Sequence, residues 1–134
     1  MITSTKLREE LKKVCPKLKF IVLTDPQWHS ITLQDFLLEK QSQQIIDFAD
    51  NVFGCEEYAM KFVVDYRIEE RIKLRSLNAP LGFVHGTKYK GKEINHSWNI
   101  VYTEDKGFVC FEPQLNNDYW IASNKTDNIY FAHF

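Results

Sequence analysis

The sequence lacks several features that would place it in a specialised class of protein. No run approaches the ~18 apolar residues of a membrane span, and the N-terminus has no apolar stretch of the signal-peptide kind. The formal net charge is −1, without the basic excess that nucleic-acid binding requires. We therefore expect no membrane span and no nucleic-acid partner, and a cytoplasmic or virus-associated location without a secretion signal.

Cysteine is scarce and widely spaced. Cys15, Cys55 and Cys110 form no C-x-x-C pair. A disulfide framework and a zinc site are therefore not expected, and at least one thiol should be free. Internal repeats, linkers and low-complexity segments are also absent, so the 134 residues are expected to form one domain spanning 1–134.

The pattern of hydrophobic residues predicts helices first and strands afterwards, which is an α+β layout. Apolar residues at helical spacing predict a helix over 3–14, a second over 33–39 capped by Ser30 or Thr32, and a long third helix that begins at Cys55. The sequence predicts strands at 19–23, 81–85, 94–102, 108–111, 119–122 and 128–133, a loop at 27–30, and turns at 86–91, 103–107 and 116–118. The segment 45–52 fits neither pattern clearly.

A hairpin formed by 94–102 and 108–111 organises the second half of the chain. With Glu104 at the middle of the turn, His96 lies directly opposite Glu112. Side chains alternate along a strand, so His96 and Glu112 should share a mostly apolar face with Trp98 and Cys110. A histidine facing a carboxylate is the arrangement of an oriented base.

Cys55 is the cysteine best placed to act as a nucleophile. It lies at the start of the long helix, where unpaired N–H groups and the helix dipole stabilise a thiolate and lower the pKa of the thiol. Cys15 and Cys110 are expected to be buried structural thiols. The order Cys55, His96, Glu112 places a nucleophile on a helix and a base with its orienting carboxylate on strands.

These motifs resemble a known family. The runs Gly-Cys55-Glu-Glu-Tyr-Ala, His96-Ser-Trp-Asn and Glu112-Pro-Gln are similar to those of the papain-like C-terminal domain of fungal chimerolectins and of related small phage and bacterial proteins. His96 follows Cys55 by 41 residues and Glu112 follows His96 by 16, intervals that suit the family pattern. The resemblance covers roughly residues 50–122.

The resemblance implies a papain-like fold and a calcium-dependent cysteine protease activity. Cys55 would be the nucleophile, His96 the base and Glu112 the orienting carboxylate, with a peptide or protein as substrate. Gln27 would supply a second oxyanion donor, as a glutamine upstream of the cysteine does in papain-like enzymes. Calcium ligands would come from Glu56, Glu57 and Gln114, although a turn contact is an equal alternative for Gln114.

Other functions remain open. The main alternative is a catalytically inactive binding or structural protein of phage accessory type on the same fold, which is favoured by Gly54 where the family has an aspartate. Acyl transfer to an amine is a second possibility for the same site. A metal site made of His85, His96 and Glu112 ranks third. The sequence does not predict an oligomeric state.

Overall fold

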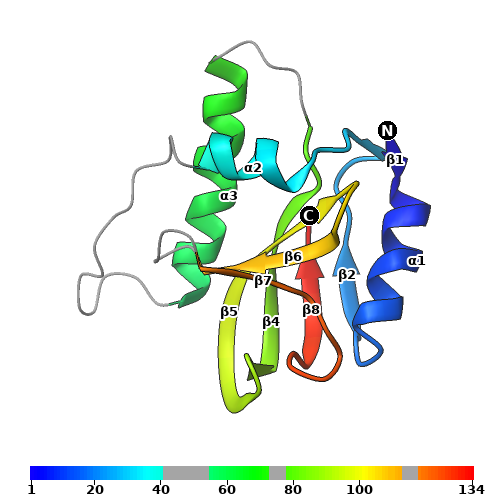
Figure 1. Cartoon of the computed structure of the whole chain (residues 1–134), viewed down its shortest axis with the longest axis vertical. Helices are drawn as coiled ribbons and strands as arrows, with labels where there is room; N and C mark the ends of the chain where they lie inside the picture. Colours follow the sequence, from blue (N-terminus) through cyan, green and yellow to red (C-terminus); the bar gives the residue numbers. More distant parts are fainter. Residues whose placement is uncertain (41–54, 73–77, 113–117) are drawn as a thin grey trace.

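The computed structural model of the chain describes residues 1–40, 55–72, 78–112 and 118–134 (Figure 1). The helices are α1 (Ser4–Val14), α2 (Leu33–Lys40) and α3 (Cys55–Ile72). The strands are β1 (Ile2–Thr3), β2 (Phe20–Val22), β3 (Gln27–Trp28), β4 (Leu81–Tyr89), β5 (Lys92–Thr103), β6 (Gly107–Phe111), β7 (Tyr119–Ile121) and β8 (Ile129–His133). In the part of the chain described, no helix is long and apolar enough to cross a membrane. The segment 45–52 and most of the turn predicted at 116–118 lie outside the described residues.

The two N-terminal helices begin at side-chain caps, as expected. The hydroxyl of Thr3 accepts a hydrogen bond from the Lys6 N–H at 3.2 Å, and the hydroxyl of Thr32 accepts one from the Asp35 N–H at 3.2 Å. The predicted cap at Thr32, of the two that were considered, is therefore the one used.

Six strands form one sheet in the order β2-β8-β4-β5-β6-β7. Neighbouring strands are antiparallel except β2 and β8, which are parallel. The C-terminal strand β8 lies inside the sheet, between β2 and β4 (Figure 1). The loop predicted at 27–30 is partly wrong, because Gln27 and Trp28 form β3 and pair with β1 in a separate two-stranded sheet.

The turn predicted at 86–91 is only partly right, because β4 continues to Tyr89. The turn consists of Lys90 and Gly91, whose φ angles of 51° and 82° suit a tight two-residue hairpin. Gly86 was interpreted as a break, but it lies within the strand, where the ring of Trp98 passes over it.

The register of the central hairpin differs from the prediction by two residues. Thr103 pairs with Gly107 and Ile100 with Cys110, so the turn is centred on Asp105 rather than Glu104. Because side chains alternate with a period of two, a shift of two residues keeps every side chain on its predicted face. His96 and Glu112 therefore still share a face, although they are no longer directly opposite.

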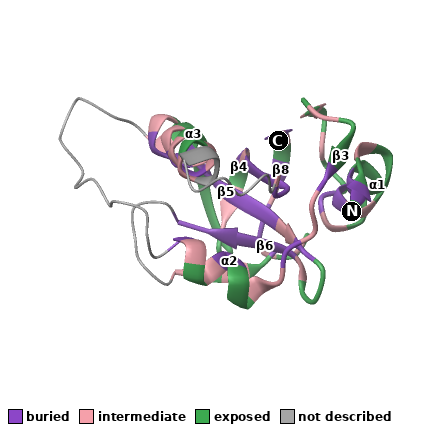
Figure 2. Ribbon diagram, turned by 90° about the horizontal axis from the view of Figure 1, so that it is seen from above, coloured by how far each residue is buried: buried purple, intermediate pink, exposed green. Residues whose placement is uncertain are grey.

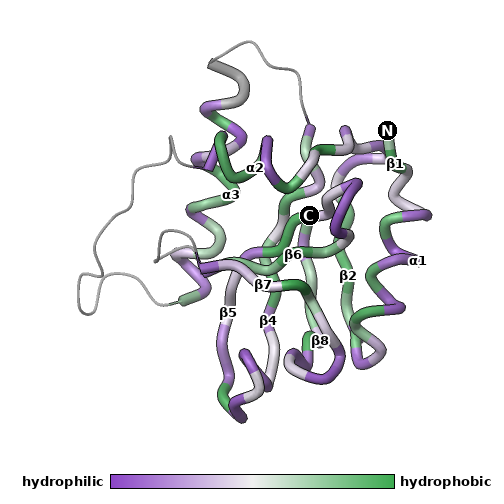
Figure 3. The backbone as a smooth tube through the Cα atoms, in the orientation of Figure 1, coloured by the Kyte–Doolittle hydropathy of each residue, from purple (hydrophilic) through white to green (hydrophobic). Residues whose placement is uncertain are grey.

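The helices cover both faces of the sheet. On one face α1 buries Leu7 and Leu11 against Trp98 and Ile100. On the other face α2 and α3 pack against the sheet through an aromatic cluster that contains Phe36, Phe62, Tyr66 and Phe111. Figure 2 shows β6 and the middle of β5 buried between these layers, and Figure 3 shows β2 and β6 as hydrophobic and α1 as mostly hydrophilic. The molecule is thus an α+β fold with helices packed on a mostly antiparallel sheet, as the sequence predicts.

Candidate active site

Cys55 is the first residue of α3 and is half-buried. Its thiol lies 3.4 Å from the Glu56 carboxylate, to which it donates. Burial raises the pKa of the Cys55 thiol, and Glu56 adds to the rise, while hydrogen bonds from the backbone and side chain of Ser97 oppose it. The lowered pKa predicted from the helix start is therefore wrong for this resting structure, because desolvation outweighs the donors. A thiolate at neutral pH needs a cation beside the sulfur.

His96 and Glu112 form the predicted pair. Nε2 of His96 lies 2.9 Å from Oε2 of Glu112, and the two side chains are 20% and 7% exposed. The ring of Trp98 stacks on His96 at 6.1 Å and is fully buried, so it packs in the core and also shields the pair from water. Because Nε2 is engaged by Glu112, Nδ1 is the ring nitrogen that faces a further partner.

Tyr89 completes this group, although the sequence analysis did not identify it. Its hydroxyl donates to the same oxygen of Glu112 at 3.0 Å, and its ring lies 4.4 Å from the ring of His96. Alternation along 81–89 would not have placed it, because a bulge between Gly86 and Lys88 shifts the register and brings Tyr89 onto the face of Val84 and Trp98. Tyr89 was also missed because Gly86 was interpreted as the end of the strand.

Ser97 lies on the opposite face of β5 from His96, toward α3. It pairs with His85 of β4, and the Ser97 hydroxyl is hydrogen-bonded to Nδ1 of His85. Two residues further along β5, the Asn99 amide donates to the Ala59 carbonyl of α3 at 2.8 Å and to the Gly82 carbonyl of β4 at 3.1 Å. The asparagine of the His-Ser-Trp-Asn motif therefore ties the helix of Cys55 to the sheet.

The structure brings together part of the predicted constellation. His96 and Glu112 are in contact, and Cys55 lies against Ser97, the next residue after His96. Contact between the Cys55 sulfur and the His96 ring stays a prediction. The structure does not gather the alternative metal site of His85, His96 and Glu112, because His85 shares the face of Ser97 and not that of His96.

Gln27 is not placed near Cys55. Its carbonyl accepts a hydrogen bond from Asn78, whose side chain also contacts Arg67. Arg67 follows Cys55 by 12 residues on α3, which corresponds to about 18 Å along a helix. The structure therefore gives no support to an oxyanion role for Gln27.

The expected calcium site is only partly covered by the structure. Glu56 and Glu57 are neighbours in the first turn of α3, and Gln114 lies outside the described residues. Across the described ranges no group of three or more His, Cys, Asp or Glu side chains is arranged to hold a metal ion. A calcium site that includes Gln114 stays a prediction, and calcium has no part in the steps considered below.

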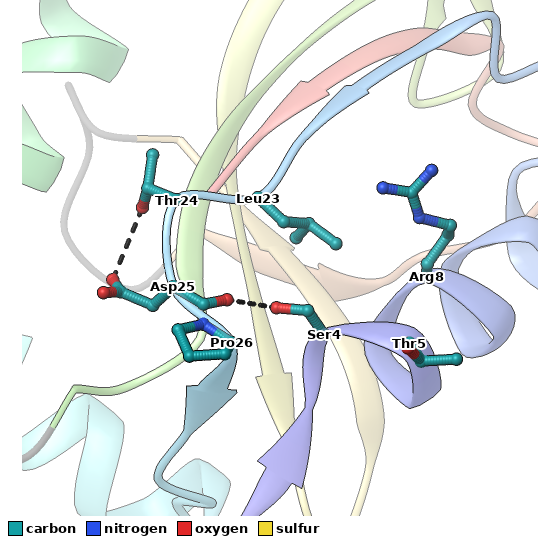
Figure 4. Close-up of a pocket in the computed structure, with 7 residues that line it drawn as sticks. All are labelled: Ser4, Thr5, Arg8, Leu23, Thr24, Asp25 and Pro26. Carbon is teal, nitrogen blue, oxygen red and sulfur yellow. Dashed lines mark hydrogen bonds between the residues drawn. The ribbon is translucent and has the colours of Figure 1, made fainter.

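The structure also contains a cavity whose lining residues are far from Cys55, His96 and Glu112 in the sequence. It has a volume of about 380 Å³ and is formed by the first turns of α1 and the segment 23–26 (Figure 4). The Ser4 hydroxyl closes it by donating to the Asp25 carbonyl. Cys55, His96 and Glu112 do not line this cavity.

Comparison with solved structures shows which proteins share this fold. PSL1a, solved as a complex with E64, matches 99% of this chain with a TM-score of 0.75 and 19% identity. A Polyporus squamosus lectin bound to the human-type influenza-binding epitope Neu5Acα2-6Galβ1-4GlcNAc matches 99% with a TM-score of 0.75 and 20% identity. The chain spans about half the length of each, 50% and 49% respectively.

Sequence comparisons identify no family or curated relative that would extend this structural similarity. No protein-family model matches the chain, and no curated protein matches it. At about one residue in five identical, the structural match establishes the fold and not the activity. The chain has the papain-like α+β fold predicted from its sequence, and it shares that fold with half of the chimerolectin PSL1a.

Proposed function

We propose that this protein is a thiol hydrolase of the cysteine peptidase type that acts through Cys55, His96 and Glu112. The observation that carries the proposal is the 2.9 Å hydrogen bond between His96 and Glu112, one residue along β5 from the Ser97 that contacts the Cys55 thiol. The fold shared with PSL1a, solved with E64, supports it. The substrate would be a peptide or a protein.

The proposed chemistry follows from the roles of the three side chains. His96 takes the proton of the Cys55 thiol, and the resulting imidazolium supplies the cation that the half-buried thiolate needs. The sulfur then attacks the substrate carbonyl carbon, and His96 gives the proton to the leaving amine. Water, deprotonated by His96, hydrolyses the thioester and returns the thiol. Glu112 holds Nε2 and stabilises the imidazolium.

The first prediction is that Cys55 is the selectively reactive thiol of the folded protein. Burial raises the pKa of Cys15 to about 12 and that of Cys110 well above its usual range, so both should resist alkylation. We expect E64 or iodoacetamide at pH 6 to modify Cys55 alone, as measured by intact mass and peptide mapping. The label should be lost in Cys55→Ala and kept in Cys15→Ala.

Labelling that is equal in wild type and Cys55→Ala would contradict the proposal. A protein with a reactive Cys55 that cleaves no peptide in a diverse peptide library would favour the alternative, a binding protein on the same fold. Added amines separate hydrolysis from acyl transfer, because acyl transfer yields the amide of the added amine.

A further inference from the structure

A second histidine reaches the neighbourhood of Cys55 from the face of β5 opposite His96. His85 on β4 pairs directly with Ser97 on β5, and Nδ1 of His85 is hydrogen-bonded to the Ser97 hydroxyl. The two side chains point toward α3, the helix that begins with Cys55. The sequence analysis considered His85 as part of the alternative metal site with His96 and Glu112.

The helix places Cys55 over this pair. The Asn99 amide holds the Ala59 carbonyl at 2.8 Å, which fixes the second turn of α3 over β5. Four residues back along α3 is about 6 Å, and two residues back along β5 is about 6.6 Å. Cys55 therefore lies over Ser97, in agreement with the hydrogen bonds that the Ser97 backbone and hydroxyl make to the thiol.

The ring of His85 is held in a fixed orientation. The ring of Phe131 lies 5.0 Å away and that of Phe83 lies 5.7 Å away, edge-on. Burial lowers the pKa of His85, and the Glu56 carboxylate opposes this effect, so the ring is neutral at neutral pH. A neutral ring with its proton on Nδ1 donates to the Ser97 oxygen, which leaves the hydroxyl proton for the sulfur.

We propose that His85 and Ser97 are positioning residues for Cys55, forming a donor chain from Nδ1–H to the hydroxyl and from the hydroxyl to the sulfur as the thiolate forms. This proposal rests on the proposed function, because it assigns a role at the same thiol. It differs from the triad in that His85 acts only through Ser97. Of the described residues, Glu56 on α3 contacts the sulfur, His85 on β4 interacts with the Glu56 carboxylate, and His96 on β5 faces the sulfur by the triad proposal.

The test measures the second-order rate constant for alkylation of Cys55 by iodoacetamide at pH 7. We expect Ser97→Ala to lower it about twofold to tenfold, the range for one net hydrogen bond. His85→Ala should lower it in the same direction by a smaller factor. His85→Asn should restore it, because an asparagine amide offers an N–H near the position of Nδ1–H. Ser97→Thr keeps the hydroxyl and should stay close to wild type.

A double variant distinguishes the loss of the donor chain from a general loosening of the side-chain packing around Cys55. If His85 acts only through Ser97, His85→Ala should have no further effect in the Ser97→Ala background. His29→Ala, at the other end of α3, serves as the control and should leave the rate unchanged. Thermal unfolding of each variant shows whether its fold is intact.

Four outcomes would overturn the proposal. Folded Ser97→Ala and His85→Ala proteins that react at the wild-type rate would remove it while leaving Cys55 as a reactive thiol. Additive effects of the two substitutions on the alkylation rate would contradict the donor chain. A His85→Asn protein that reacts as slowly as His85→Ala would contradict it as well. A wild-type Cys55 that does not react at all would remove both this inference and the proposed function.

Discussion

One oxygen of Glu112 accepts two hydrogen bonds, from Nε2 of His96 at 2.9 Å and from the Tyr89 hydroxyl at 3.0 Å. Glu112 is 5% exposed, so these donors replace water that the buried carboxylate has lost. Two donors from different strands hold the carboxylate in one orientation. That orientation in turn fixes the ring of His96, so Tyr89 acts on the base from two directions, through Glu112 and through its own ring.

Tyr89→Phe removes the hydroxyl and keeps the ring. We expect the alkylation rate of Cys55 and any peptidase activity to fall about twofold to tenfold, because Glu112 loses the hydrogen bond from the Tyr89 hydroxyl. The alkylation rate and the peptidase activity should fall further in Tyr89→Leu, since the ring contacts with His96 at 4.4 Å and Trp98 at 5.2 Å disappear as well. The comparison is made on purified proteins with equal thermal midpoints.

The matched control for this experiment is Tyr119→Phe, because Tyr119 is 43% exposed on the edge strand β7. It should behave as wild type in both assays. A Tyr89→Phe protein indistinguishable from Tyr119→Phe would mean that the hydroxyl contributes nothing to orienting the base.

At the scale of the secondary-structure elements, the site depends on how closely β4 and β5 approach. Gly86 lies opposite His96, and a side chain at Gly86 would meet the Trp98 ring at 2.6 Å and the Asn128 carbonyl at 2.9 Å. The absent Cβ therefore lets Trp98 lie flat beside His96. Gly107, in contrast, has open space around it but a φ of +70°.

Alanine substitutions at the two glycines should separate stability from reactivity. Gly86→Ala forces Trp98 to move and should cost about 1–3 kcal/mol of unfolding free energy, the usual range for overpacking, together with a slower reaction at Cys55. Gly107→Ala strains only the turn and should cost about 1–2 kcal/mol with no change in the reaction of the folded protein. Urea unfolding and alkylation kinetics test both, and equal kinetics in the two variants would contradict the role of Gly86.

Local patterns predicted most of the elements because each depends on nearby residues. The apolar spacing of Leu7 and Leu11 and the cap at Thr32 are sufficient to place α1 and α2. The register of the central hairpin depended on the exact turn, and the prediction differed by two residues. His96 and Glu112 still share a face, as predicted, because a register shift by an even number of residues leaves each side chain on the same face of the sheet.

The features that could not be predicted from the sequence depend on contacts between residues that are far apart along the chain. Gln27 was assigned to the site by analogy, yet its hydrogen bond to Asn78 places it at the far end of α3. Tyr89 was missed because Gly86 serves packing rather than a turn, and because the bulge between Gly86 and Lys88 changes the face on which Tyr89 lies. The partnership of His85 and Ser97 requires the β4–β5 register, which the pattern of residues alone does not fix.

At the scale of the whole molecule, the sheet separates two cores with different roles. The core on the α3 face is the aromatic cluster around Phe62 and Phe111, whereas the core on the α1 face holds two thiols, Cys15 and Cys110, which are 2% and 0% exposed. Desolvation raises the pKa of both. These thiols are therefore structural groups, and their burial links the stability of the whole fold to alkaline pH.

The direction of that linkage follows from the two states. Above pH 9 the unfolded chain releases the protons of Cys15 and Cys110, while the folded chain retains them, because their pKa values are raised from 9.0 in the fold. Their stabilising effect is thus present below pH 9 and is lost as pH rises. Between pH 8 and pH 10 each thiol should therefore lower the free energy of unfolding, because in this range the proton is released when the chain unfolds.

Without the two thiols, the free energy of unfolding should therefore depend less strongly on pH in the alkaline range. We expect the Cys15→Ala, Cys110→Ala double variant to be less stable than wild type at pH 8, because small cavities replace the sulfurs. Its further loss of unfolding free energy between pH 8 and pH 10 should be smaller than that of wild type, because the two groups that ionise only on unfolding are gone. Urea unfolding at the two pH values measures this difference. Parallel profiles would mean that water reaches the α1 core, because only hydrated thiols would ionise equally in the folded and unfolded chains.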